Sequence, residues 1–350
     1  MMGRIGRGLR TRVENAAPAL SSSSSSSTSS TSSSSPSPPP PPPPPRDTAA
    51  AAAVQASRGA ETATSAAASL PLPAVEDDAA VVQWDQWGLV MAEACTLGAR
   101  HGRGWRVLNC LLASSGIPEP LRGKLWQELC GATEVATARL SADFVRLMKQ
   151  RSIDEEQILK DLHRTLPDHE LFQDGRGQTS LFNVVKCYSL YDKECGYCQG
   201  LANVAATLLL HTSMDEEVSF AILVKLMEEP PYKMRGQYSR GMPALQLRLW
   251  QFERLLLLHL PRFGQNLIEV GVLPTTYASE WFLTLFAYNW PVDLVARVWD
   301  LLLTHGIIAI FAVALAVCQA AEEQCRRDCA LDLELTVALL RVRVQLIGHL

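Results

Sequence analysis

The sequence predicts an all-α fold, and three observations support this. From about residue 80 onward, apolar residues recur at intervals of three and four, whereas the strict alternation typical of strands is nearly absent. Proline and glycine fall between these periodic segments, as at Pro167, Pro230-Pro231 and Pro291, where they end or separate helices. The chain has 350 residues and is 47% hydrophobic, which is enough to bury one or two cores.

Residues 1–75 are expected to form a disordered tail in front of the folded part. Residues 21–35 are only Ser and Thr, and residues 36–45 are Pro apart from Ser37. Such a segment buries too little apolar area to offset the entropy lost on ordering. The Pro run predicts an extended polyproline II segment, which is either a plain spacer or a ligand for an SH3-type or WW-type domain.

The first twelve residues contain four arginines and no acidic residue. A disordered tail is the favoured interpretation of this composition. An organelle transit peptide has a similar composition and is the alternative.

The folded part is expected to begin near Trp84 and Trp87, where the composition changes. Each helix is expected where apolar residues follow a helical period between two breakers. The expected helices cover residues 84–98, 103–113, 119–131, 138–147, 153–166, 178–193, 200–212, 216–228, 243–260, 264–270, 276–288, 292–304, 307–321 and 331–345.

One stretch, residues 301–321, has no Asp, Glu, Lys or Arg and is long enough to cross a membrane. Thr304-His305-Gly306 interrupts it, and glycine commonly ends a helix. We therefore expect two adjoining helices, the second buried in a large core, and no transmembrane segment.

Charge and cysteine content exclude several classes of function. The net charge is −4, so the strongly basic field typical of nucleic-acid binders is absent. The nine cysteines are expected to be reduced thiols in a cytoplasmic protein. Cys195-x-x-Cys198 has no second Cys or His pair at metal-ligand spacing, so we expect no metal site. The sequence also lacks a glycine-rich phosphate loop ending in Lys-Ser or Lys-Thr, so no nucleotide is expected to bind the chain alone.

The first segment with a candidate functional side chain is 153–166. In a helix there, Arg164 lies almost opposite the apolar face and points away from the core. Asp161, three residues earlier, is expected on the helix surface, close enough to form an ion pair with it. The apolar face is expected to consist of Ile158, Leu159, Leu162 and Leu166. By periodicity alone, Arg164 is interpreted as an ordinary solvated arginine.

The second segment is Gly196-Tyr197-Cys198-Gln199-Gly200, a short loop between two expected helices. Glycine at both edges permits unusual backbone angles and close approach by another molecule. Gln199 lies at the start of the next helix, where its amide can orient a water molecule or exchange hydrogen bonds. A tight turn with a capping polar residue is the alternative interpretation.

Taken together, Ile158-x-x-Asp161-x-x-Arg164 and Tyr197-x-Gln199-Gly200 resemble the paired signature of TBC-domain Rab GTPase-activating proteins. The flanks are also similar to that family, at Gly116–Trp126, Tyr277–Phe286 and Arg297-Val-Trp299-Asp300. The resemblance covers residues 80–345 and is most specific over 116–320.

The resemblance implies that the chain is an activator rather than an enzyme in itself. Arg164 and Gln199 would enter the active site of a GTP-bound Rab protein as catalytic residues. Asp161, Tyr197 and Gly200 would support them. GTP and Mg²⁺ would belong to the Rab, so the chain would need no cofactor. The family implies a role in vesicle trafficking, with recruitment of a cytoplasmic protein to endomembranes by the Rab. A non-catalytic binding module or scaffold for a GTP-bound Rab is the alternative.

Overall fold

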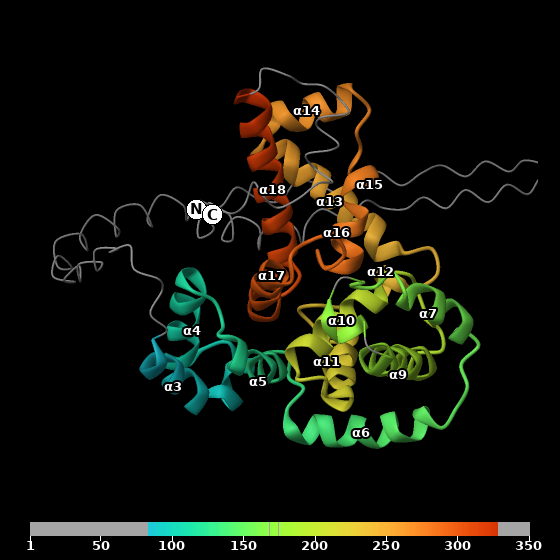
Figure 1. Ribbon diagram of the computed structural model, residues 1–350. Coiled ribbons are helices and arrows are strands. Elements are labelled where there is room, and N and C mark those ends of the chain that lie inside the picture. Colours follow the sequence, from blue (N-terminus) through green and yellow to red (C-terminus); the bar gives the residue numbers. More distant parts are fainter. Residues whose placement is uncertain (1–82, 168, 174, 328–350) are drawn as a thin grey trace, which may run out of the picture. The chain divides into compact units, whose positions relative to one another are not determined.

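The computed structural model describes residues 83–167, 169–173 and 175–327 (Figure 1). All regular elements in these residues are helices, which confirms the all-α prediction. In chain order they are α3 (Trp84–Ala92), the 3₁₀ helix η2 (Ala94–Ala99), α4 (Gly102–Ser114), α5 (Glu119–Leu129), α6 (Glu134–Met148), α7 (Glu155–Leu162), α8 (Glu170–Gln173), α9 (Gly175–Tyr191), α10 (Leu201–His211), α11 (Glu216–Glu228), α12 (Arg235–Tyr238), α13 (Pro243–His259), α14 (Pro261–Glu269), α15 (Pro274–Tyr277), α16 (Ser279–Thr284), α17 (Val292–His305) and α18 (Ile308–Arg327).

Several expectations lie outside the described residues. They are the disordered tail over 1–75, the alternative transit peptide, the Pro run at 36–45 and the helix over 331–345.

The first group of helices, drawn green to yellow in Figure 1, surrounds α9 and α10. Helices α6, α7, α8, α10 and α11 all pack on α9, and α10 also contacts α5, α7 and α11. Helix α10 is apolar on almost every side, since Leu201 through Leu209 are all buried. A helix that is hydrophobic all round belongs in a core. The two segments that precede and follow α9 are therefore held against a buried framework.

The second group, drawn orange to red in Figure 1, is built on α13. This helix contacts α12, α14, α15, α16 and α18, while α17 packs on α18 and on α5. The expected helix over 276–288 is wrong in extent. It is divided into α15 and α16, and it stops at Leu285 and Phe286, which both adopt positive φ. Both side chains are buried, so core packing outweighs the backbone preference at these positions.

The predicted break in the long apolar stretch is confirmed. Helix α17 ends at His305, Gly306 has φ of +79°, and α18 then begins at Ile308. One helix in the described part of the chain, Ile308–Arg326, is long and apolar enough to cross a membrane by length and composition. Of the most apolar 18 residues of this helix, 56% are buried against the rest of the fold. Helix α18 packs on α13, α16 and α17.

Other helices also differ from expectation at their ends. The helix expected over 84–98 is α-helical only to Ala92, where the backbone changes to the 3₁₀ form of η2. The helix expected over 153–166 begins at Glu155 and ends at Leu162. Leu159, expected on its apolar face, is 49% exposed, whereas Ile158 and Leu162 are buried. The early end of α7 determines where Arg164 lies.

Candidate functional site

Arg164 lies in the turn that follows α7, and Asp161 holds it there by two contacts. The Arg164 backbone N–H donates to the Asp161 carbonyl at 3.2 Å. The Arg164 Nη2 donates to Asp161 Oδ1 at 2.5 Å, which confirms the predicted ion pair. The arginine side chain is 49% exposed, whereas the carboxylate is 4% exposed. Arg164 therefore has a buried anchor and a guanidinium that remains open to solvent.

Asp161 was expected on the surface of the helix, and the structure corrects this. The residue is 3% exposed, and Tyr197 of the glutamine loop, residues 192–200, bonds its carboxylate. The Tyr197 hydroxyl donates to Asp161 Oδ2 at 2.6 Å, and Gln157 Nε2 donates to Oδ1 at 3.2 Å. A buried carboxylate needs such donors, since an unpaired charge is costly to bury. One aspartate thus joins the arginine turn to the loop that carries Gln199.

A second carboxylate of α7 fixes the same loop. Asp154 is at the N-terminal cap position of α7, yet its side chain does not cap that helix. Instead, Asp154 Oδ2 accepts a hydrogen bond from the Tyr197 backbone N–H at 3.1 Å. Tyr197 is therefore held through both its backbone and its side chain. Sequence reasoning missed Asp154, because its partner lies 43 positions away in the chain.

The glycines at the two edges of the pentapeptide adopt the backbone angles that only glycine adopts readily. Gly196 has φ of +62° and Gly200 has φ of +98°. Gly200 is buried, and a Cβ there would touch Leu283 of α16 at 3.5 Å. Gln199, directly before it, is exposed two residues ahead of the first residue of α10. The loop therefore turns sharply against the core while presenting Gln199 outward.

The two cysteines of the loop are poor candidates for thiolate chemistry. Burial raises the pKa of Cys195 to about 11, and burial likewise raises the pKa of Cys198 above its ordinary value. A thiol must ionise to act as a nucleophile or a metal ligand. Among the described residues, no group of three or more His, Cys, Asp and Glu side chains is arranged to hold a metal ion.

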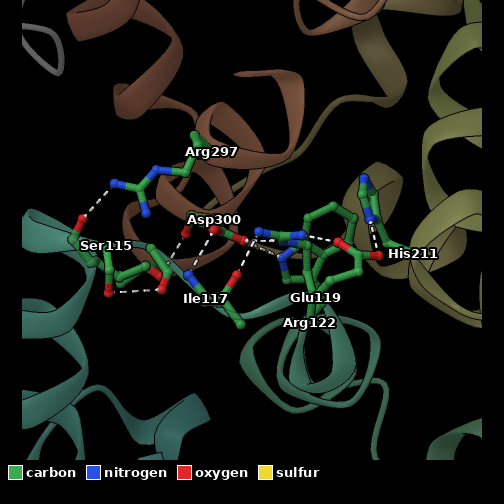
Figure 2. A network of polar contacts seen from close by, with 11 residues as sticks. Ser115, Ile117, Glu119, Arg122, His211, Arg297 and Asp300 are labelled. Carbon is green, nitrogen blue, oxygen red and sulfur yellow. Dashed lines mark hydrogen bonds and ion pairs between the residues drawn. The ribbon is translucent and has the colours of Figure 1, made fainter. Parts of the chain in front are cut away.

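A second polar network lies around Asp300 of α17, and it differs in that its arginine is buried (Figure 2). Asp300 accepts from Arg122 Nε at 3.2 Å, from Trp126 Nε1 at 2.9 Å and from the Ile117 backbone N–H at 3.0 Å. Arg122 also bonds the Ile117 carbonyl and Glu119, and Glu119 contacts His211. These bonds join the start of α5 to α17, and they use the guanidinium on three sides.

Known proteins are similar to this chain in sequence and in fold. The family model described as "RabGAP-TBC: Rab-GTPase-TBC domain" matches residues 119–325. The Caenorhabditis elegans Rab GTPase-activating protein tbc-11 is 39% identical over 235 residues, which are 66% of this chain and 24% of that protein. Mouse TBC1 domain family member 4 is 41% identical over 216 residues, which are 59% of this chain and 16% of that protein. The chain thus matches a quarter or less of the length of these two relatives.

Solved structures show the same fold at lower identity. The Chlamydomonas flagellar RabGAP TBC domain superposes with a TM-score of 0.58 at 23% identity, covering 75% of this chain and 90% of that chain. The Ypt/Rab-GAP domain of Gyp1p gives a TM-score of 0.54 at 18% identity, covering 76% of this chain and 87% of that chain. Since the family match extends over more than half of the sequence, the chain belongs to the Rab-GTPase-TBC domain family.

Proposed function

We propose that this chain accelerates GTP hydrolysis by a Rab small GTPase, with Arg164 and Gln199 as the residues that enter the partner's active site. The observation that carries the proposal is the shared carboxylate of Asp161. It bonds Arg164 on one side and Tyr197 on the other, so the arginine turn and the glutamine loop are held together. Both candidate side chains are exposed, as insertion into a partner requires.

Arg164 has the properties needed to stabilise the transferring phosphoryl group. Phosphoryl transfer depends mainly on positioning and on stabilising negative charge, with little covalent chemistry for the protein to perform. A guanidinium stays protonated and offers several donors in a fixed plane. The bond to Asp161 uses Nη2, and the side chain is still 49% exposed. Arg164 can therefore reach a partner's phosphate while Asp161 limits the directions in which it points.

Gln199 has the properties needed to orient the attacking water. Its amide offers both a donor and an acceptor, and it carries no charge that would oppose a nucleophile near phosphate. The loop that presents it is fixed through Tyr197 and Gly200, so the side chain starts from a defined position. Preorganised groups of this kind lower the barrier without reorganising during the reaction. The nucleotide and Mg²⁺ belong to the GTPase in this proposal.

Single-turnover GTP hydrolysis tests the proposal directly. A panel of purified Rab proteins loaded with GTP is mixed with the full chain, with Arg164→Ala or with Gln199→Ala. We expect the wild type to accelerate at least one Rab, and each variant to lose most of that acceleration. Arg254→Ala is the matched control, because Arg254 is also exposed and paired with a carboxylate, on α13. Binding of GTP-loaded Rab without acceleration would instead identify a non-catalytic binding module.

The domain limits and the tail are tested in the same assay. We propose that the TBC domain at 80–345 acts without residues 1–75, so deleting those residues should leave the accelerated rate unchanged. Loss of acceleration on deletion would show that the tail is part of the active unit. The cellular location in this proposal is the cytoplasm, with recruitment to endomembranes by the Rab partner.

A further inference from the structure

The glutamine loop is fixed on the side of α7 by Asp154 and Asp161, and a different element fixes its beginning. That element is α12, a four-residue helix that lies between α11 and α13. Arg235, its first residue, contacts two acidic residues at the start of the loop. This attachment does not involve the arginine turn.

Arg235 holds the loop through a forked contact. Its Nε and Nη2 both donate to the Asp192 carboxylate, the latter at 2.9 Å, and Nη2 also donates to Glu194 Oε2 at 2.7 Å. Bidentate pairing of this kind fixes direction as well as distance. The Asp192 side chain is 10% exposed, so the contact is partly shielded from water. Burial opposes ionisation of Asp192, but Arg235 and the backbone N–H groups of Cys195 and Glu194 together outweigh it, and the pKa of Asp192 is lowered.

Asp192 in turn folds the loop that follows it. Its Oδ1 accepts a hydrogen bond from the Cys195 backbone N–H at 3.1 Å. Its carbonyl accepts one from the Gly196 N–H at 2.8 Å. The carboxylate that Arg235 bonds therefore also stabilises the turn that leads to Tyr197 and Gln199. Without Arg235, this carboxylate would be free to rotate away from the turn.

Helix α12 is itself anchored by buried contacts, so it can serve as a fixed support. Gln237 is fully buried, and its Nε2 donates to the Phe282 carbonyl at 3.1 Å. The Tyr238 hydroxyl donates to the Leu283 carbonyl at 2.5 Å. Leu283 is also the residue that Gly200 approaches at the other end of the loop. The beginning of the glutamine loop is thus attached to α12, and its end packs against α16. Hydrogen bonds join α12 to α16, so both ends have a common support.

We propose that Arg235 is a positioning residue for Gln199, which it acts on by clamping Asp192 and Glu194 at the start of the glutamine loop. The inference rests on the proposed function, in which Gln199 orients the attacking water. Water orientation is sensitive to small displacements, and a misplacement of about 1 Å can cost about 10²-fold in rate. Arg235 therefore contributes to the chemical step without touching the GTPase's nucleotide.

Steady-state kinetics of the full chain on GTP-loaded Rab test this. For Arg235→Ala we expect kcat to fall about tenfold, with KM changed less than about threefold, because Gln199 is misplaced while the docking surface is kept. Arg235→Lys should recover part of kcat, since lysine keeps the charge but loses the fork. Arg254→Ala is the control and should leave both constants unchanged. In a Gln199→Ala background, adding Arg235→Ala should cost nothing more, because the residues act as one unit.

The outcomes separate this inference from the proposed function. An unchanged kcat in Arg235→Ala, or an equal loss in the Gln199→Ala background, overturns the positioning role while the proposed function stands. If wild type accelerates no Rab, the proposed function fails. Amide hydrogen exchange then tests whether Arg235 fixes the glutamine loop. We expect faster exchange over 192–200 in Arg235→Ala than in wild type or Arg254→Ala, with α13 unchanged. Equal exchange in all three proteins overturns the clamp.

Discussion

Two buried aspartates, Asp161 and Asp300, bond the same kinds of side chain and yet organise two different kinds of site. Each accepts hydrogen bonds from an arginine and from an aromatic side chain, Arg164 and Tyr197 in one case. In the other, Arg122 and Trp126 are the donors. The carboxylates are 3% and 1% exposed, respectively. The acceptor is therefore equivalent, and the difference lies in the arginine.

The exposure of the arginine separates a pair that is used inside the fold from one that can reach another molecule. The Arg122 side chain is 9% exposed, and its donors are used by Asp300, Glu119 and the Ile117 carbonyl. The Arg164 side chain is 49% exposed and contacts its aspartate through one nitrogen. A guanidinium whose donors are used inside the fold contributes to stability. One that is anchored at a single atom keeps donors for another molecule.

The largest expected effect is on catalysis, from Arg164→Ala. Removing an arginine supplied in trans to a GTPase costs about 10³–10⁵ in rate. Asp161 is buried, but water can replace the half-exposed guanidinium beside it, so the free energy of unfolding should fall by only about 1–2 kcal/mol. Single-turnover hydrolysis and urea denaturation measure the two quantities on the same protein. A loss of stability comparable to that of Arg122→Ala would remove the distinction between the two pairs.

The next effect is on stability, from Arg122→Ala. Asp300 is buried, and burial raises its pKa even with Arg122 beside it. Removing one partner of a buried ion pair leaves the other charge uncompensated, at a cost of about 3–5 kcal/mol. Urea denaturation should show that loss. A variant as stable as wild type would mean that Trp126 and the Ile117 N–H are enough to hold the carboxylate.

Tyr197→Phe should have a smaller and mixed effect. It removes the 2.6 Å hydrogen bond to Asp161 and keeps the ring. Burial and the neighbouring Asp161 raise the pKa of Tyr197, so the hydroxyl remains a donor at neutral pH. We expect the free energy of unfolding to fall by about 1–2 kcal/mol and the stimulated rate to fall about tenfold. Stability loss with an unchanged rate would show that Asp161 positions Arg164 without help from the loop.

The smallest effect is a pH dependence within the Asp300 network. Burial lowers the pKa of His211 below its ordinary value of 6.5, despite the 2.7 Å contact between His211 Nδ1 and Glu119. The unfolded chain therefore binds a proton near pH 6.5 that the folded chain does not, and stability falls as the pH drops through that value. The slope from one such group is at most about 1.4 kcal/mol per pH unit.

Urea denaturation between about pH 7.5 and pH 5.5, with wild type and His211→Gln, measures this slope. The variant should show a flatter profile than wild type. Identical profiles would assign the pH dependence to other groups, and the single-turnover rate at fixed pH is the control for an intact site.

Helical periodicity was enough to predict the fold class and most helices of the described part. It placed α11, α13 and α17 within a residue or two, because their apolar faces are continuous and their ends are marked by Pro, Gly or acidic residues. It missed the short helices α8 and α12 and the division of α15 from α16. Those features depend on contacts distant in sequence, such as Gln237 with Phe282, which no local pattern encodes.

The candidate site was predicted in part. The pairing of Asp161 with Arg164 follows from helical spacing, and the glycine pair at 196 and 200 follows from the need for positive φ. The burial of Asp161 could not be predicted, since it depends on Tyr197 folding back over α7. Asp154 and Arg235 were also missed, because each bonds a residue about 40 positions away.

The most direct test of the central claim uses a transition-state mimic. Aluminium fluoride bound beside GDP imitates the planar phosphoryl group in transfer, and transition-state analogues bind at least about 10²-fold tighter than substrates. Binding of the full chain to GDP-loaded Rab proteins is measured with and without aluminium fluoride, for wild type, Arg164→Ala and Gln199→Ala. We predict tight binding of one Rab by wild type only when the mimic is present, and its loss in both variants. Binding that ignores the mimic, or that survives both substitutions, would contradict the roles proposed for Arg164 and Gln199.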